Sequence, residues 1–122
     1  MREIEFRGYN KITKEWYYGY LNKFDNLYFI DDGTGTKPFV EEDSIGQYTG
    51  FTDKNGKKIY EGDIIKTYID DIDTGNYEVL WWNECGEWAM FSKKTFRSMH
   101  EAMARICEVI GNTYEEKLKD FK

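Results

Sequence analysis

IGQYTGFTDKNGKKIYEGDIIK, residues 45–66, contains two apolar runs separated by a turn signal. The runs are aromatic and β-branched, a composition that favours strands, and Asn55-Gly56 lies between them. Asn and Gly both tolerate the positive φ angles that hairpin turns demand, so this pair is a strong short-range hairpin signal. The stretch therefore predicts a β-hairpin, followed by another strand from Asp63 to Ile69.

Glu61-Gly62-Asp63 interrupts the second apolar run of this stretch. A Gly-Asp step suits a sharp bend in which the Asp carboxylate accepts hydrogen bonds from nearby backbone N–H groups. The alternative is that Glu61 and Asp63 form a carboxylate pair for metal binding or acid–base work. We favour the bend, because turn chemistry explains both residues.

Upstream of this stretch, the pattern predicts a hairpin and two further short strands. Residues 2–8 alternate, which places Ile4 and Phe6 on one face and charged side chains on the other. The expected elements are strands at 2–8, 16–21, 27–30 and 39–40, with a polar turn at 10–14 and loops at 22–25 and 31–38.

Downstream, the pattern predicts two more strands, one helix and a final strand. Ser98 and Glu101 match a capping box, and the apolar residues that follow have helical spacing. The expected elements are strands at 77–83, 87–91 and 107–111, a turn at Cys85-Gly86, a polar connection at 92–97, a helix at about 99–105 and a charged tail at 114–122 that can be helical.

Aromatic side chains fall on both faces of two predicted strands, for example Trp81 and Trp82 on opposite faces of the strand at 77–83. Burial on both sides suits a curved, closed wall. We therefore expect a mainly β fold, an antiparallel-rich pseudo-barrel of several hairpins with one short α-helix near the C-terminus. At 122 residues, the chain is expected to form a single domain over 1–122.

The chain carries a net charge of −6, which keeps a protein soluble and repels nucleic-acid phosphates. No stretch has the length and apolarity of a membrane span, and no signal peptide is apparent. These observations predict a cytoplasmic protein without membrane contact, and they make a protein partner more plausible than a nucleic acid.

The sequence offers little for metal or nucleophilic chemistry. His100 is the single histidine, and Cys85 and Cys107 lie far apart, so we expect free buried thiols. Asp71 and Asp73 have the spacing of calcium ligands, but the rest of that ligand pattern is missing. We expect no metal, no cofactor and no catalytic residues, and therefore not an enzyme, although carboxylate catalysis needs no sequence spacing.

The central stretch resembles the signature of the YopX-like family, small proteins encoded by phages and prophages of bacteria. The resemblance extends to residues 1–8, to Glu15–Gly19 and to Glu108–Glu115, in the order found in the family. After Tyr114-Glu115 the family tends to continue with Asn-Pro, whereas this chain has Glu116-Lys117. The resemblance implies a β-rich pseudo-barrel in a bacterial host cell, with no assigned activity and no catalytic residues.

These observations lead to the hypothesis of a non-enzymatic module that binds a macromolecule, with a protein as the expected partner. The alternative is a nucleic-acid-binding accessory protein on a small β-barrel, and a carboxylate-using enzyme is a third candidate. Exposed aromatic side chains would serve the first two functions, and Tyr17, Trp82 and Trp88 are the candidates for such a surface.

Overall fold

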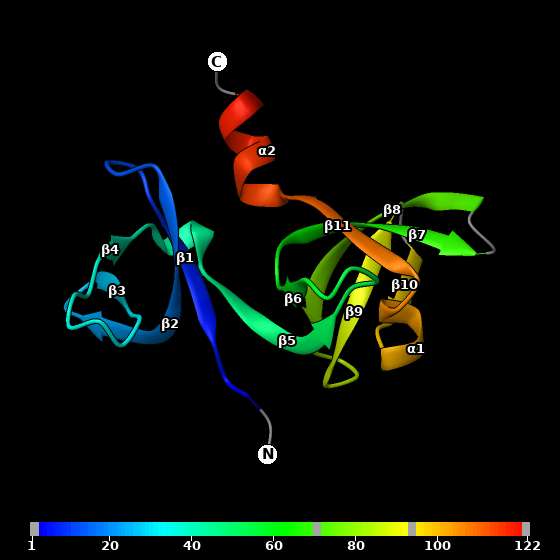
Figure 1. The fold of residues 1–122 in the computed structure, drawn as a ribbon, viewed down its shortest axis with the longest axis horizontal. Helices are drawn as coiled ribbons and strands as arrows, with labels where there is room; N and C mark the ends of the chain where they lie inside the picture. The colour runs from blue at the N-terminus through cyan, green and yellow to red at the C-terminus, as the bar shows by residue number, and fades with distance from the viewer. Residues whose placement is uncertain (1–2, 70–71, 93–94, 121–122) are drawn as a thin grey trace. The chain divides into compact units, whose positions relative to one another are not determined.

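The computed structural model describes residues 3–69, 72–92 and 95–120. Its strands form two antiparallel sheets, with the orders β4-β3-β2-β1-β5-β6 and β10-β9-β8-β7-β11 (Figure 1). The predicted mainly β, antiparallel fold is confirmed, but the described strands form two sheets and not a closed barrel.

Contacts within the chain group it into two compact units, Met1–Tyr48 and Thr49–Lys122. We describe each unit by itself, and the single domain over 1–122 stays a prediction. The strand β5, Gly46–Thr52, begins in the first unit and ends in the second.

The first unit is built on the predicted hairpin, and β1 pairs with β2 from Phe6↔Gly19 to Asn10↔Glu15. The prediction of a loop at 22–25 was wrong, because β2 continues to Phe24 and pairs with β3 up to Phe24↔Leu27. The elements are β1 Phe6–Asn10, β2 Glu15–Phe24, β3 Leu27–Asp31, β4 Phe39–Val40, the short 3-10 helix η1 Glu42–Ser44 and the start of β5.

The predicted faces of the first strand were also wrong. Ile4 lies before β1 and is 57% exposed, whereas Arg7 is only 7% exposed. The Arg7 guanidinium stacks over the Trp16 ring, 4.8 Å from its centroid. A planar cation on a long apolar stem can pack against an aromatic face, which explains how a charged residue lies where an apolar one was expected. Residue 2 lies outside the described residues.

Two glycines allow the close packing of the first unit. A Cβ on Gly8 would lie 2.6 Å from Val40 Cβ, and a Cβ on Gly19 would lie 2.1 Å from the backbone oxygen of Asp31. Side-chain atoms do not approach this closely, so β1 meets Val40 of β4 only because residue 8 lacks a side chain.

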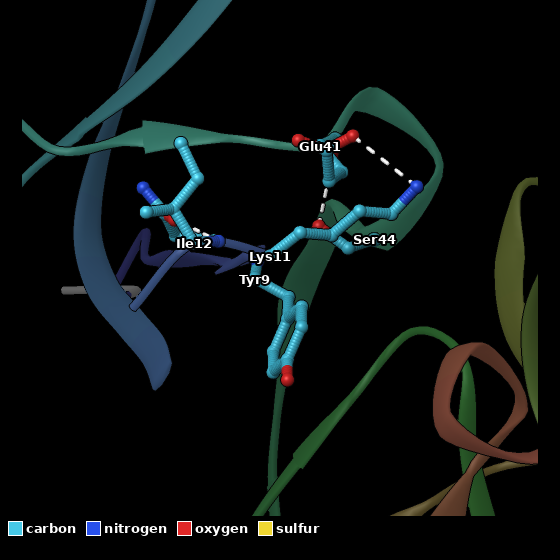
Figure 2. A network of polar contacts seen from close by, with 6 residues as sticks. Tyr9, Lys11, Ile12, Glu41 and Ser44 are labelled. Carbon is cyan, nitrogen blue, oxygen red and sulfur yellow. Dashed lines mark hydrogen bonds and ion pairs between the residues drawn. The ribbon is translucent and has the colours of Figure 1, made fainter. Parts of the chain in front are cut away.

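A network of polar contacts connects the turn after β1 to η1 (Figure 2). The Ser44 hydroxyl accepts from Tyr9 N–H at 2.8 Å and donates to the Glu41 backbone oxygen at 2.6 Å. Glu41 N–H donates to Tyr9 O at 2.8 Å, and Lys11 Nζ lies 3.6 Å from Glu41 Oε1. These bonds satisfy the backbone groups of Tyr9 in β1 and of Glu41 before η1, as buried or half-buried polar groups require.

The second unit contains the five-stranded sheet and two short helices. Its elements are the end of β5, then β6 Lys58–Tyr60, β7 Asp63–Ile69, β8 Ile72–Trp82, β9 Glu87–Ser92, β10 Thr95–Ser98, α1 Glu101–Ala104, β11 Cys107–Asn112 and α2 Thr113–Asp120. Its core is a cluster of buried side chains on one face of the sheet: Ile59, Ile65, Val79, Trp88, Met90, Met99, Ala104 and Cys107.

Three expectations for the second unit need correction. The polar connection at 92–97 was wrong, since its later residues form β10. The capping box was also wrong: His100 is the N-cap of the shorter helix α1 and its Nδ1 accepts from Met103 N–H at 3.3 Å, while the Ser98 hydroxyl donates to Glu87 Oε1 at 2.6 Å. Finally, the tail, which the sequence allowed to be helical, forms α2, so the described residues contain two α-helices where one was expected.

The hairpin predicted from Asn55-Gly56 is present, but its turn has an additional anchor in Asp53. Only Gly56 of the pair takes a positive φ, +80°. The Asp53 carboxylate, 5% exposed, accepts from Asn55 N–H at 2.8 Å and Lys57 N–H at 2.9 Å through Oδ1, and from Val109 N–H at 3.0 Å through Oδ2. This turn is therefore hydrogen-bonded to strand β11 of the five-stranded sheet.

The predicted bend at Gly62-Asp63 is confirmed. Gly62 has a φ of +91°, and the Asp63 carboxylate, 1% exposed, accepts from Tyr60 N–H at 2.7 Å. Gly62 N–H donates to Val79 O, and Thr113 N–H donates to Gly62 O, each at 2.8 Å. The bend thus serves as a junction between β6, β7, β8 and the start of α2.

The close contact at Gly8 gives a first prediction. Gly8→Ala should destabilise the protein by about 1–3 kcal/mol, because the new methyl group overlaps Val40 and forces β1 and β4 apart. Gly111→Ala is the matched control, since the nearest atom to its Cβ is 3.8 Å away. Denaturant unfolding followed by circular dichroism measures both. Equal stability of the two variants would contradict the packing described here.

The Asp53 carboxylate gives a second prediction. Asp53→Asn should lower the free energy of unfolding by about 1–3 kcal/mol, because an NH₂ group replaces one acceptor oxygen and leaves a backbone N–H unpaired. Asp43→Asn, at an exposed position in η1, should change it by less than about 0.5 kcal/mol. Urea titrations of both variants test this, and an unaffected Asp53→Asn protein would show that the carboxylate is dispensable.

Candidate functional site

The five-stranded sheet packs one face on the core, and strands β8, β9 and β10 carry aromatic and acidic side chains on its other face. The β8–β9 register pairs Trp82 with Glu87 and Glu78 with Phe91, and the β9–β10 register pairs Phe91 with Phe96. Residues directly opposite each other share a face, so all five side chains lie on the side away from Val79, Trp88 and Met90. We call Glu78, Trp82, Glu87, Phe91 and Phe96 the aromatic face.

The three rings of the aromatic face are contiguous, with Phe96 stacked on Trp82 and tilted by 40° against Phe91. The centroids of Trp82 and Phe96 are 4.9 Å apart with an interplanar angle of 23°, and those of Phe91 and Phe96 are 4.6 Å apart. Trp82 and Phe96 come from strands on either side of β9, where Ala89 lies between them and is 0% exposed. A small residue on the central strand leaves room for the two rings to meet above it, which accounts for its burial.

The rings remain accessible. Phe96 is 42% exposed, and Trp82 and Phe91 are half-buried. Contiguous exposed aromatic surface is unusual on a protein that has no partner, since large apolar patches mark interaction sites. The aromatic face is therefore a candidate binding surface of the second unit.

Carboxylates accompany two of the rings. Glu87 lies opposite Trp82, and Glu78 lies opposite Phe91. Cross-strand neighbours have Cβ atoms about 5 Å apart, so each carboxylate is within reach of a group that contacts the ring beside it. The Ser98 hydroxyl fixes Glu87 by its bond of 2.6 Å to Oε1. Chemically, a ring face with a neighbouring carboxylate suits a cationic side chain.

The three aromatic residues that the sequence suggested have different environments. Trp82 lies on the aromatic face, whereas Trp88 is 7% exposed on the opposite side of the sheet, so it is not a surface residue. Tyr17 belongs to the first unit, is half-buried, and its hydroxyl contacts Thr13 and Glu15. Trp82 and Trp88 thus lie on opposite faces of one sheet, and Tyr17 belongs to the other unit.

Phe91 and Phe96 were missed from the sequence. Phe96 lies in the segment that was expected to be a polar connection, so no strand face was assigned to it. A period-two reading of 95–98 would have placed Phe96 and Ser98 on one face, but four residues are too few to identify a strand on their own.

The described residues hold no group of three or more His, Cys, Asp or Glu that could bind a metal. Asp71 lies outside the described residues, so the calcium-like spacing of Asp71 and Asp73 stays without a structural test. His100 caps α1, and the Asp63 carboxylate is used in the bend. A groove of about 290 Å³ beside α1 contains Glu101 and Arg105, which pair with each other at 2.6 Å.

The two cysteines are in different environments, and the expectation that both are buried was wrong for Cys85. Cys85 is exposed in the turn after β8, whereas Cys107 is fully buried. The Cys107 thiol donates to Met103 O at 3.1 Å. Burial, and secondarily the negative charge of Asp53, raise the pKa of Cys107 to about 11.

In the part of the chain that the structure describes, neither helix has the length and apolar character needed to cross a membrane.

Comparison with known proteins places most of the chain in one family. The family model described as "YopX protein" matches residues 5–118. No curated protein matches the chain.

The contrast between the cysteines predicts selective thiol labelling. In the native protein at pH 8, a maleimide should label Cys85 rapidly and leave Cys107 unmodified, because a buried thiol with a pKa of about 11 forms little thiolate. Cys85→Ser should abolish rapid labelling, and Cys107→Ser should not. Mass spectrometry of the native and the urea-unfolded protein counts the labels. Rapid labelling of native Cys85→Ser protein would refute the buried position of Cys107.

Proposed function

Because the chain belongs to the YopX family, we propose that it is a phage-type binding module that recognises a protein in the host cytoplasm through its aromatic face. In this proposal the chain binds its partner and catalyses no reaction. The stack of Trp82, Phe96 and Phe91 is the observation that carries it.

Aromatic side chains supply large contact area at low entropic cost, which is why they are enriched in protein interfaces. The three rings are already in contact with one another, so binding would require little further ordering of their side chains. The surface therefore has the composition and the preorganisation of a protein-binding site.

Aromatic stacks also bind single-stranded nucleic acid, usually beside a basic groove. Here the charges on the aromatic face are carboxylates, from Glu78 and Glu87, and the whole chain carries −6. Phosphate groups would meet like charge on this face. A protein ligand is thus favoured over a nucleic acid, and the experiment below distinguishes the two.

A photo-crosslinking residue in place of Phe96, introduced in bacterial cells that express the full chain, should yield a covalent adduct with a protein partner after irradiation. The same residue in place of Ile12, which is 88% exposed in the first unit, is the control and should yield no such adduct. Trp82→Ala should strongly reduce the adduct formed at position 96, because it removes the neighbouring ring of the aromatic face.

Adducts are detected by gel shift, and their nature is determined by protease and nuclease treatment. An adduct that is sensitive to nuclease would overturn the proposal in favour of nucleic-acid binding. No adduct at position 96, or equal adducts at positions 96 and 12, would show that the aromatic face is not a recognition surface. Circular dichroism of each variant confirms that the fold is retained.

A further inference from the structure

The outer strand β10 has backbone groups that no described segment uses. Met99 N–H donates to Trp88 O at 3.0 Å, which identifies Met99 and Trp88 as a hydrogen-bonded pair of the β9–β10 register. Hydrogen-bonded and non-bonded pairs alternate along an antiparallel ladder. The backbone N–H and C=O groups of Phe96 and Ser98 therefore point away from β9, toward the open edge of the sheet.

The opposite edge of the same sheet is protected. Strand β11 is its last strand, and there Lys54 N–H donates to Cys107 O at 2.9 Å while Asp53 accepts from Val109 N–H at 3.0 Å. Exposed edges are a liability that proteins usually cover or disrupt. One edge of this sheet is closed by the Asp53 turn, and all four residues of β10 at the other edge are exposed.

A strand added to β10 would place alternate side chains on the aromatic face. Phe96 and Ser98 have backbone groups that point to the open edge and side chains that lie on the aromatic face. A strand that bonds to these two residues therefore lies beside the rings. On the aromatic face, the carboxylate nearest to such an added strand is that of Glu87, which accepts from the Ser98 hydroxyl and lies opposite Trp82. Lys93 and Lys94, between β9 and β10, lie outside the described residues.

We propose that an extended segment of the protein partner adds to the edge of β10 as a strand, and that it places a Lys or Arg side chain on the aromatic face beside Trp82 and Glu87. This inference rests on the proposed function and specifies its ligand. Main-chain bonds to Phe96 and Ser98 supply affinity, and the cation–π and ion-pair contacts supply specificity.

A second copy of the chain is a less suitable occupant of this edge. Two copies could pair through the outward groups in several registers, and in the one that joins Phe96 of one copy to Ser98 of the other, the two Arg97 side chains lie directly opposite each other. Like charges directly opposite each other destabilise a strand pair, and each copy also carries a net charge of −6. A basic extended segment would bring positive charge to the carboxylates of the aromatic face, without a second net charge of −6.

The test uses a display library of random linear peptides, selected against the full chain, with the selected peptides then synthesised. Selected sequences should share a Lys or Arg at one position. Amide hydrogen exchange followed by nuclear magnetic resonance should show that the peptide slows exchange of the Phe96 and Ser98 amides. This second measurement uses the unmodified chain, so it does not depend on whether a variant folds.

Ser98→Pro should weaken peptide binding about tenfold, because it removes one backbone N–H that would donate to the peptide. The fold should be retained, because this N–H points outward and is not used in pairing with β9. Ser98→Ala is the matched control, because it retains the backbone N–H and should bind far more tightly than Ser98→Pro. Glu87→Gln should reduce the affinity for basic peptides by a few-fold and reduce its dependence on salt.

Peptides that bind Ser98→Pro as tightly as the original chain, without slowing amide exchange at Phe96 and Ser98, would overturn strand addition and leave the proposed function intact. Selected peptides without basic residues would overturn the assigned ligand chemistry. Concentration-dependent dimers that Ser98→Pro abolishes would show that the edge serves a second copy. If the crosslinker at position 96 also captures no protein, the proposed function itself fails.

Discussion

Three backbone N–H groups converge on one buried carboxylate, that of Asp53, and the second unit depends on this convergence. Two of the donors belong to the hairpin turn itself, and the third is Val109 in a strand more than fifty residues away. A carboxylate buried without such donors would be strongly destabilising, so its desolvation is tolerable only when the turn and β11 are both in place. Local turn formation and long-range sheet assembly are therefore coupled through one side chain.

The same stretch contains a second carboxylate with a structural role. Asp63 accepts from Tyr60 N–H, and Gly62 beside it connects to Val79 and Thr113 through backbone bonds. Both acidic residues thus satisfy backbone groups in the interior. The most recognisable part of the sequence is accounted for by the demands of folding, and the candidate binding surface lies elsewhere, on β8, β9 and β10.

This division explains the character of the five-stranded sheet. One of its faces carries the core, and its β11 edge is closed by the Asp53 turn. The other face carries stacked rings with neighbouring carboxylates, and the β10 edge has outward backbone groups. The open face and the open edge meet at Phe96 and Ser98, so a ligand that uses one is placed to use the other.

The hairpins, the bend at Gly62-Asp63 and the family could be predicted from the residues alone, because they depend on local signals: strand alternation, turn residues and a contiguous motif. It could not determine which aromatic residues are exposed. Trp81, Trp82 and Trp88 are chemically alike in a strand pattern, and only the register of β8 against β9 buries Trp88 and leaves Trp82 on the aromatic face. Phe96 joined that face only through pairing with Phe91 across the sheet. The backbone hydrogen bonds of these pairings can be made by every residue type, so the residue types alone do not fix the register, and it was found only in the folded sheet.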